Sequence, residues 1–242
     1  MECFDITFDR PAENLACDEV LLDAVESGRM DEALRFWESP SHFVVLGVSQ
    51  VLAVEVDEAA CARDSVPILR RASAGGCVLQ GPGSLNFSLI VRRDSHPSLA
   101  TIRNSYCHLL GRVCRALATL DIRAQHAGIS DLAVGELKVS GNAQKRRRNA
   151  ILHHGTLVHS LDLDRVRRYL HEPVDRPEYR GDRNHDAFMA ALPAHAEQLR
   201  HAVWHEFAPD TPISTALDPA YLEPIQALAQ DKYAAESWIR RR

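Results

Sequence analysis

The spacing of apolar residues along the chain predicts helices that alternate with many short strands. Apolar residues that recur at intervals of three and four predict amphipathic helices, and strict alternation of apolar and polar residues predicts half-buried strands. Helical spacing covers four stretches: 11–28, 56–64, 102–117 and the chain from about 162 onward, where a polar segment at 173–184 interrupts it. A proline at the start of the first stretch and a glycine at its end fit the two ends of a helix.

Strand patterns fill most of the remaining sequence up to residue 159. They cover residues 34–37, 43–48, 67–69, 85–91, 122–125, 131–134, 137–139 and 150–159. The Ser39-Pro40-Ser41 turn joins the first two, and Gly135-Glu136 between two apolar runs is a hairpin signal. Because hairpins outnumber strand–helix–strand units, we predict an α+β fold with mostly antiparallel or mixed sheets and flanking helices.

Composition limits the possible classes of protein. The 242 residues suffice for one large domain or one domain with a small extension. A net charge of -5 argues against nucleic-acid binding, and no apolar run is long enough for a membrane span. The N-terminal residues lack the pattern of a signal peptide. Six cysteines without a C-x-x-C pair argue against a disulfide framework or a zinc site, so we expect a cytoplasmic protein with reduced thiols.

The stretch RRASAGGCVLQGPG, residues 70–83, combines two arginines with four glycines. It matches neither the P-loop nor the dinucleotide-binding pattern. Glycines let backbone N–H groups approach a ligand, and arginines add fork-shaped donors for phosphate or carboxylate. The stretch therefore suggests a loop that holds an anionic ligand. A glycine-rich hairpin with solvated arginines is about as compatible with composition alone.

Two further motifs place reactive side chains on predicted strands. In LKVSGNAQ, residues 137–144, Lys138 has an apolar setting from which its ammonium could stabilise a developing oxyanion; a snorkelling surface lysine is the alternative. In LHHGTL, residues 152–157, the adjacent histidines face opposite sides, so one can face a pocket and the other the core. The same residues could be ordinary sheet histidines. The basic run 145–148 between the motifs is expected to be a solvated loop.

Taken together, the order and spacing of these three motifs resemble the lipoate–protein ligase family. The resemblance covers roughly residues 10–192, including Asn14-Leu15-Ala16, Asp18-Glu19 and Arg35-Phe36-Trp37. It implies a biotin/lipoate ligase (class II synthetase-like) catalytic domain over 1–242. Residues 195–242 would be a helical C-terminal extension, too short to be the large accessory domain of two-domain ligases.

The resemblance also implies a two-step reaction. ATP and lipoate, or octanoate, would form an acyl-adenylate with Mg²⁺ present, and the lysine of an apo lipoyl domain would then accept the acyl group. The acceptors would be lipoyl domains of 2-oxoacid dehydrogenase subunits or the glycine-cleavage H protein. Without the accessory domain, a full ligase could need a separate small subunit.

Carried over residue by residue, the resemblance assigns roles to twelve positions. Lys138 would stabilise the carboxylate and adenylate oxygens, and Asp131 would lie near the phosphates and magnesium. The remaining substrate-binding and adenylate-binding residues would be Arg70, Ser73, Gly75, Gly76, Cys77, Asn86, Gly141, Ala143, His154 and Trp37. Of these, His154 would line the acyl tunnel and Trp37 would pack on the acyl tail. The basic run 145–148 would lie beside the loop over the adenylate or face the acceptor.

Departures from the family pattern leave a rival open. Ala74 stands where many members have glycine, and Gln80-Gly81 stands where many have a histidine–aspartate pair. The rival is an octanoyl or lipoyl transferase of the same fold that works from a carrier protein without ATP. Such enzymes use a cysteine nucleophile, and the only thiol in a candidate pocket loop is Cys77, which we interpret as a small space-filling residue. A biotin ligase is disfavoured because its arginine–glycine loop pattern is absent.

Overall fold

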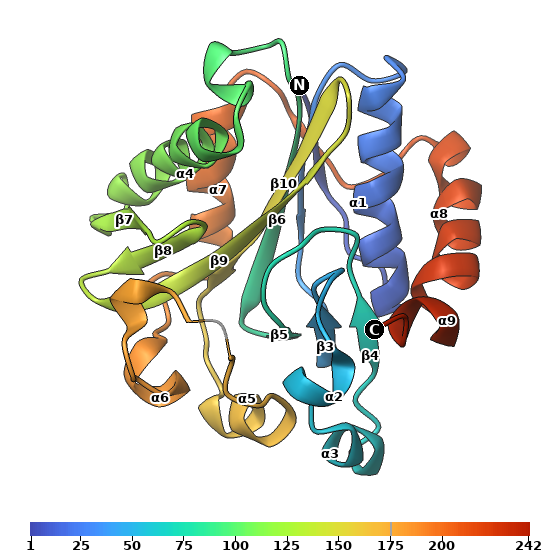
Figure 1. Cartoon of the computed structure of the whole chain (residues 1–242). Coiled ribbons are helices and arrows are strands. Elements are labelled where there is room, and N and C mark those ends of the chain that lie inside the picture. Colours follow the sequence, from blue (N-terminus) through green and yellow to red (C-terminus); the bar gives the residue numbers. More distant parts are fainter. Residues whose placement is uncertain (175) are drawn as a thin grey trace.

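Two β-sheets of different size form the framework of the computed structural model, which describes residues 1–174 and 176–242 (Figure 1). The larger sheet has the strand order β11-β1-β2-β6-β10-β9-β8-β7, and the smaller has the order β4-β3-β5. The strands of the larger sheet are β1 (Glu2–Asp5), β2 (Ala33–Trp37), β6 (Ser84–Arg92), β7 (Ala124–Ala127), β8 (Asp131–Val134), β9 (Leu137–Arg146), β10 (Ala150–Val158) and β11 (Ile213–Ser214). Those of the smaller sheet are β3 (Phe43–Leu46), β4 (Ile68–Arg70) and β5 (Val78–Gln80).

The pairing is mostly antiparallel, as predicted. Strand β1 pairs in parallel with β2 and β11, β3 pairs in parallel with β4, and the other pairs are antiparallel. The α+β class with mixed sheets is therefore confirmed. The turn at 39–41 joins strands β2 and β3 as expected, and the two strands belong to different sheets. The turn thus carries the chain from one sheet to the other.

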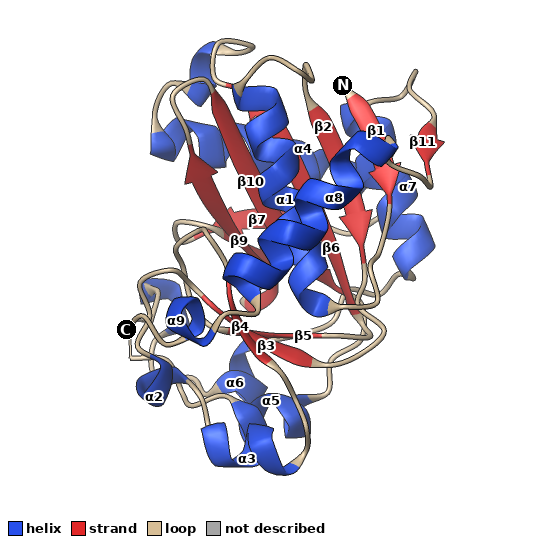
Figure 2. Cartoon of the chain, turned by 90° about the vertical axis from the view of Figure 1, so that its right-hand side faces the viewer, coloured by secondary structure: helices blue, strands red, loops and turns tan. Residues whose placement is uncertain are grey.

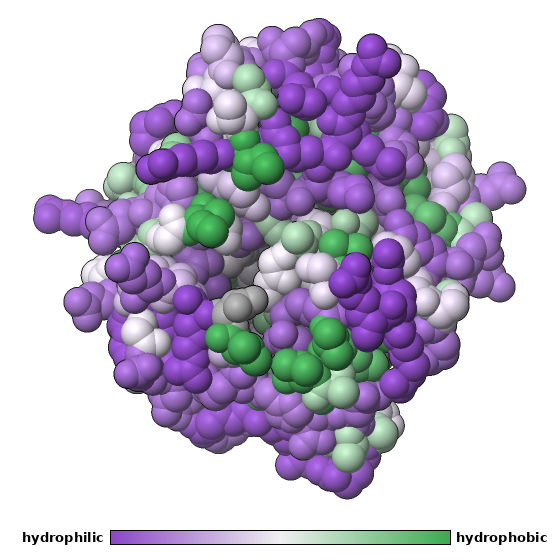
Figure 3. Space-filling view, viewed as in Figure 1, coloured by the Kyte–Doolittle hydropathy of each residue, from purple (hydrophilic) through white to green (hydrophobic). Residues whose placement is uncertain are grey.

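Helices cover both faces of the larger sheet, and Figure 2 shows α1 and α8 in front of it with α4 and α7 behind. The helices are α1 (Pro11–Glu26), α2 (Leu52–Glu55), α3 (Glu58–Arg63), α4 (Ile102–Ala118), α5 (Leu163–Tyr169), α6 (His185–Phe188), α7 (Ala196–Phe207), α8 (Leu222–Leu228) and α9 (Glu236–Ile239). Short 3₁₀ turns lie at Pro97–Leu99, Glu178–Arg180 and Pro219–Tyr221, and a π-helical turn lies at Ala229–Tyr233. The face of the molecule in Figure 3 is mostly hydrophilic, with separate hydrophobic patches. Among the described residues, no helix has the length and apolar character needed to cross a bilayer.

Each face of the larger sheet has its own apolar core. Strand residues such as Phe87 and Ile151 pack with α4 and α7 on one side. Helix α1, the α8 region and residues such as Ile90 and Leu152 form the second core on the other side. A third, smaller cluster joins the small sheet to α2, α3 and α5. The cavity described below lies where the small sheet and α1 meet the central strands.

The basic run 145–148 is only partly the solvated loop that the sequence suggested. Lys145 and Arg146 belong to β9, and the Arg146 guanidinium donates to the carbonyl of Leu99 at 2.6 Å. Arg147 lies in the following turn and forms an ion pair with Asp23 of α1 at 3.0 Å. The expectation of a loop is therefore wrong for Lys145 and Arg146. The reason is that the long arginine stems reach neighbouring elements and place their charges against polar partners.

Candidate functional site

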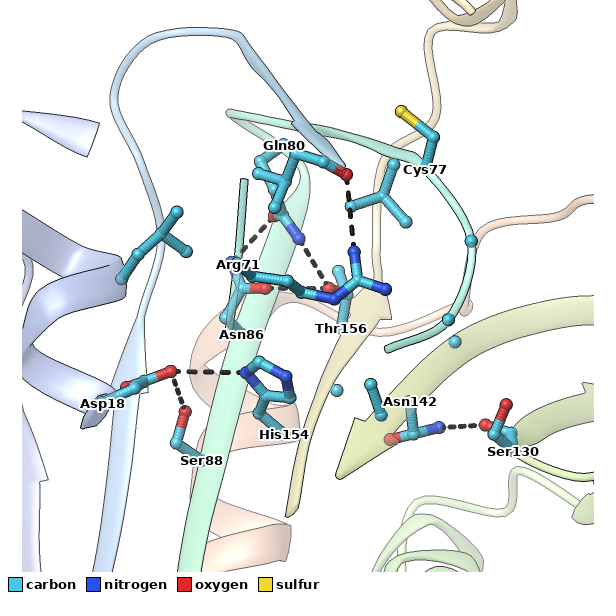
Figure 4. A pocket seen from close by; sticks show the side chains of 18 of the residues that line it. Asp18, Arg71, Cys77, Gln80, Asn86, Ser88, Ser130, Asn142, His154 and Thr156 are labelled. Atoms are coloured by element: carbon cyan, nitrogen blue, oxygen red, sulfur yellow. Dashed lines mark hydrogen bonds and ion pairs between the residues drawn. The ribbon is translucent and has the colours of Figure 1, made fainter. Parts of the chain in front are cut away.

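The three central strands β6, β10 and β9 place polar and small residues side by side on one face. His154 lies opposite Ser88 on one neighbour and Ala143 on the other, and Thr156 lies opposite Asn86 and Gly141. Because strand side chains alternate between faces, these positions share one side of the sheet. They form the floor of a cavity of about 130 Å³, shown from close by in Figure 4.

Most of the candidate residues line this one cavity. Ten of the twelve do so: Trp37, Gly75, Gly76, Cys77, Asn86, Asp131, Lys138, Gly141, Ala143 and His154. They come from β2, the loop after β4, and strands β6, β8, β9 and β10. Segments more than a hundred residues apart in the sequence therefore converge, as the resemblance implied. The two exceptions, Arg70 and Ser73, are buried behind the cavity wall.

The arginine of the cavity is Arg71, and the expectation that Arg70 grips the ligand is corrected. Arg70 is fully buried and donates to the carbonyls of Gly47 at 2.8 Å, Gln50 at 2.7 Å and Ile239 at 2.9 Å. Arg71, the next residue, lines the cavity. Adjacent side chains at the end of a strand point to opposite sides, so only one of the pair can face the ligand.

Arg71 is a buried charge whose partners within the described residues are neutral oxygens. Its Nε donates to the Ser73 hydroxyl at 3.0 Å, and its terminal nitrogens donate to the carbonyls of Ala74 at 2.7 Å and Val45 at 3.4 Å. Burial lowers the pKa of Arg71 to about 10. Since an unpaired buried charge is costly, an anionic ligand group would be stabilised strongly at this position.

The loop after β4 requires glycine at position 75. Gly75 has a φ of +96°, and a Cβ there would lie 2.9 Å from a terminal nitrogen of Arg71. At the facing Gly47, a Cβ would lie 2.0 Å from the Gly75 carbonyl oxygen. These positions therefore exclude side chains and hold Arg71 against the loop. Ala74 is not among the residues with positive φ, so alanine fits where many relatives have glycine.

Lys138 faces the cavity and forms an ion pair with Asp131. Its Nζ lies 2.8 Å from Asp131 Oδ1, and the Tyr179 hydroxyl donates to Asp131 Oδ2 at 2.9 Å. Burial, together with the charge of Asp131, raises the pKa of Tyr179. A Cβ at Gly141 would lie 3.2 Å from the lysine Nζ, so the glycine leaves room for the ammonium. This ion pair favours a functional Lys138 over a snorkelling surface lysine.

The two histidines face opposite sides of β10, as the sequence predicted. His154 lines the cavity, with Nε2 2.6 Å from the Ser73 hydroxyl oxygen and Nδ1 3.5 Å from Asp18 Oδ2. His153 is fully buried against Tyr106 on the other face, and burial lowers its pKa to about 3. Ser73 thus contacts His154 and Arg71 from behind and does not line the cavity itself.

Several cavity residues were not among the candidates. Gln80, Asn86 and Thr156 form a closed ring of hydrogen bonds: Gln80 donates to Thr156 at 2.9 Å, Thr156 to Asn86 at 2.8 Å, and Asn86 back to Gln80 at 2.9 Å. Asn86 was among the predicted site residues, and Gln80 was noted only as a departure from the family pattern that changes a pocket contact. Strand alternation from His154 gives Thr156, which was therefore detectable, whereas Gln80 depends on how the small sheet docks.

Asn142 and Asp18 are two further unpredicted cavity residues. Asn142 donates to the Ser130 carbonyl at 2.8 Å, while its Oδ1 is buried without a partner in the described part of the chain. Asp18 lies on α1 and pairs with the buried Arg35 at 2.7 Å. Its place in the Asn14–Glu19 stretch was noted in the sequence, but nothing in the sequence pattern places a helix residue against β10.

Cys77 lines the cavity as a free, half-buried thiol. Burial raises its pKa to about 12, although the nearby charge of Arg71 acts in the opposite direction. A thiol in this environment is a poor nucleophile, because thiol attack requires the thiolate. The surroundings of Cys77 therefore favour the interpretation that it fills space. All six cysteines are free.

Comparison with known sequences gives one consistent family. Residues 10–208 match the family model described as the lipoyl protein ligase A/B catalytic domain. Lipoate–protein ligase 1 of Staphylococcus aureus is 26% identical over 235 residues, which is 94% of this chain and 69% of the relative. Octanoyltransferase LipM of an Exiguobacterium species is 30% identical over 176 residues, 63% of each chain. The chain spans about half the length of several other curated relatives that it matches.

Solved structures share the fold. A bi-partite lipoate protein ligase from Thermoplasma acidophilum, described with its E2 lipoyl domain, has a TM-score of 0.82 at 23% identity, covering 99% of this chain and 96% of that one. The Thermoplasma acidophilum protein with bound lipoic acid gives 0.82 at 21% identity, with both chains fully covered. A lipoate-protein ligase A bound with ATP gives 0.82 at 24% identity and 99% coverage of both chains.

Proposed function

The chain belongs to the lipoyl protein ligase A/B catalytic-domain family, and from that premise we propose that it activates lipoate with ATP and transfers the acyl group to an apo lipoyl domain. Its named relatives are lipoate–protein ligases and an octanoyltransferase, so it is an enzyme of the lipoate ligase or transferase type. The choice of ATP-dependent ligation is our proposal. Octanoate is the alternative acyl substrate.

One observation carries the proposal: the cavity holds a buried arginine whose hydrogen-bond partners are all neutral. Arg71 and Lys138 line the same cavity, and within residues 1–174 and 176–242 the carboxylate that pairs with Lys138 is that of Asp131. A carboxylate substrate joined to a phosphate would complement the Arg71 charge. Gly75 and Gly76 of the glycine loop also line the cavity, and without side chains they let a ligand approach the backbone closely. Such a cavity suits an acyl-adenylate.

In the first half-reaction, a carboxylate oxygen of lipoate attacks the α-phosphorus of ATP. The bond to the β-phosphate oxygen breaks, so pyrophosphate leaves and lipoyl-adenylate remains. Lys138 would stabilise the negative charge that develops on the transferring oxygens, and Arg71 would hold the phosphate. Hydrogen-bond donors that are already fixed cost little reorganisation in the transition state.

In the second half-reaction, the neutral amine of the acceptor lysine attacks the carbonyl carbon of the adenylate. The bond between this carbon and the phosphate oxygen breaks, AMP leaves, and the amide nitrogen loses a proton. Here Lys138 would again stabilise the oxyanion. Trp37 and His154 line the cavity and would contact the acyl chain.

Magnesium would accompany ATP, and Asp131 is the residue that would hold it. Among the described residues, no group of three or more metal-ligating side chains forms a ready site. A single carboxylate still fits, because Mg²⁺ is often bound by one or two carboxylates together with substrate phosphates. When bound, the ion would neutralise phosphate charge. Before metal binding, both Asp131 oxygens accept bonds from Lys138 and Tyr179.

The proposed acceptors are apo lipoyl domains of 2-oxoacid dehydrogenase subunits or the glycine-cleavage H protein. The bi-partite ligase from Thermoplasma acidophilum, described together with its E2 lipoyl domain, supports this class of partner. The same resemblance supports a second, small accessory subunit for a complete ligase. We place the reaction in the cytoplasm.

The rival activity is acyl transfer from a carrier protein without ATP. The match to an octanoyltransferase keeps it open. The raised pKa of the half-buried Cys77 argues against it, because no other cysteine lines the described cavity. We therefore favour the ligase.

The direct test is lipoate-dependent exchange of pyrophosphate into ATP, which reports adenylate formation without any acceptor. We expect exchange with the wild-type protein and its loss in Lys138→Ala, with an unchanged circular dichroism spectrum. Lys145→Ala, on the same strand but outside the cavity lining, is the matched control and should retain exchange. Normal exchange in Lys138→Ala would remove Lys138 from the mechanism. Absent exchange in the wild type, even with the accessory subunit, would contradict the ligase.

A further inference from the structure

A line of buried polar side chains connects helix α1 to the arginine of the cavity. It begins at Asp18, which is 2% exposed and accepts hydrogen bonds from Arg35 at 2.7 Å and from the Ser88 hydroxyl at 2.7 Å. His154 follows, with Nδ1 3.5 Å from the second carboxylate oxygen, Oδ2. In Figure 4, dashed lines join the Asp18 carboxylate to the Ser88 hydroxyl and to the His154 ring.

The line continues from the other side of the imidazole. His154 Nε2 lies 2.6 Å from the Ser73 hydroxyl oxygen, and the same oxygen accepts a hydrogen bond from Arg71 Nε at 3.0 Å. The guanidinium can only donate, so the Ser73 hydroxyl accepts from it, and we assign the hydroxyl proton to the short contact with His154 Nε2. The imidazole then carries its proton on Nδ1, facing the Asp18 carboxylate. Every donor in the line therefore points from Arg71 toward Asp18.

The arrangement contains a serine, a histidine and an aspartate, which raises the question whether Ser73 is a nucleophile. Ser73 is 1% exposed and does not line the cavity, whereas His154 and Asp18 do. A nucleophile has to reach the carbonyl carbon that it attacks. The Ser73 hydroxyl is also engaged on both sides, by Arg71 and by His154. These facts indicate that Ser73 orients neighbouring side chains and does not attack the substrate.

We propose that Asp18, His154 and Ser73 are positioning residues that hold the Arg71 guanidinium in the orientation required to bind the anionic part of the substrate. The proposal rests on the proposed function for its substrate, but its geometry does not depend on it. Without Ser73, Arg71 keeps its contacts to the Ala74 and Val45 carbonyls and loses the one that fixes Nε. The guanidinium would then rotate and bind the anion less well.

The kinetic test compares Ser73→Ala with Ser105→Ala in pyrophosphate exchange. Ser105 is a fully buried serine whose hydroxyl donates to the Ile102 carbonyl, and it is absent from the cavity lining. Ser73→Ala should raise the KM for lipoate or ATP about tenfold, the effect of one hydrogen bond to a charged group, with kcat nearly unchanged. Ser73→Thr, which keeps a hydroxyl, should recover most of the loss, and Ser105→Ala should match the wild type.

Three results would overturn the proposal. A fall in kcat at constant KM, or an acyl ester found on Ser73 by peptide mass spectrometry, would make Ser73 a catalytic nucleophile. Equal changes in KM and kcat for Ser73→Ala and Ser105→Ala would show that Ser73 contributes only through packing. Unchanged kinetics in Ser73→Ala would show that Arg71 needs no such support.

A second readout does not depend on activity. Nitrogen-15 NMR of the imidazoles should show His154 protonated on Nδ1 in the wild type, with an altered Nε2 shift in Ser73→Ala and an altered Nδ1 shift in Asp18→Asn. His154→Gln identifies the signals. A proton on Nε2 in the wild type, or chemical shifts that are unchanged in both variants, would contradict the proposed line of hydrogen bonds even if exchange is normal. If exchange is absent but the nitrogen-15 shifts change in the variants, the proposed line of hydrogen bonds is supported and only the proposed function is contradicted.

Discussion

At the scale of single residues, Arg70 and Arg71 are both buried but have different partners. Arg70 holds three backbone carbonyls, including that of Ile239 near the end of the chain, while Arg71 faces the cavity. We therefore propose that Arg70 has a structural role and Arg71 a binding role. The two can be separated experimentally, because each substitution leaves the other side chain in place.

We predict opposite outcomes for Arg70→Gln and Arg71→Gln. Arg70→Gln should lower the free energy of unfolding by about 3 kcal/mol, since buried carbonyls lose their donors. Arg71→Gln should fold with little change in stability but lose substrate affinity and exchange. Urea unfolding measures the stability of each variant, and isothermal titration with ATP and lipoate measures its substrate affinity. A stable Arg70→Gln that no longer binds substrate would show that the pocket arginine is Arg70 after all.

Cys77 gives a second prediction at this scale. Since the raised pKa of its half-buried thiol disfavours the thiolate, Cys77→Ser should retain exchange and lipoyl transfer within about threefold of the wild type. Intact mass should show no thioester on the wild-type protein. A folded but inactive Cys77→Ser, with an acyl thioester on the wild type, would favour the transferase.

The sequence identified the chemistry of the cavity better than its geometry. Motif order and residue type pointed to Lys138, Asp131 and His154 from the resemblance, and all three line the cavity. The one-residue error at Arg70 arose because a short strand end does not reveal which side is enclosed. Asp18 was missed as a cavity residue because its position depends on how α1 packs across the sheet, which no local pattern encodes.

At the scale of elements, the segment after α7 is held to the catalytic part by polar contacts. Glu19 of α1 accepts hydrogen bonds from Lys232 at 2.6 Å and from the Tyr233 hydroxyl at 2.6 Å. The Trp238 indole donates to the Arg70 carbonyl at 2.8 Å. Figure 1 shows the C-terminus beside β4, the strand that leads into the glycine loop. This segment therefore supports the base of the cavity.

The Glu19 contacts give a prediction about pH. Burial raises the pKa of Glu19, but the bonds and charges of Lys232, Tyr233 and Arg147 outweigh it, so the pKa lies below the usual 4.5. A lowered pKa stabilises the folded protein above the unfolded-state pKa, and this contribution disappears as pH falls through the folded-state pKa. The difference in unfolding free energy between the wild type and Glu19→Gln should therefore be largest above about pH 5 and shrink toward pH 3.

Urea unfolding at several pH values checks this expectation, with Glu223→Gln on the exposed side of α8 as the control. A difference that stays constant down to pH 3 would show that the Glu19 carboxylate contributes through packing alone.

Long elements with a clear pattern of apolar residues were predicted well, and several short elements were missed. The pattern of apolar residues in 150–159 and 131–139 predicted β10 and the β8–β9 hairpin, which the structure confirms. Strand β1 and its parallel neighbour β11, which lies at the edge of the larger sheet, were missed, because four and two residues show little of a period. The helix expected at 56–64 is confirmed as α3, Glu58–Arg63, whereas the preceding α2, Leu52–Glu55, was not predicted.

At the scale of the whole molecule, the match to the family model ends at residue 208, and the chain continues with β11, α8 and α9. Residues 195–242 were expected to form a helical extension. They also contribute β11 to the larger sheet and the Lys232 and Trp238 contacts to the catalytic part. A transfer assay with and without an added accessory subunit tests whether such a subunit is needed.

The measurement that tests the central claim most directly is the intact mass of an apo lipoyl domain after incubation with this protein. One sample contains lipoate, ATP and Mg²⁺, and a second contains an octanoyl carrier protein without ATP. The ligase account predicts a lipoyl mass increase in the first sample, with or without an added accessory subunit, and none in the second. Modification in the second sample alone would contradict ATP-dependent activation and establish a transferase.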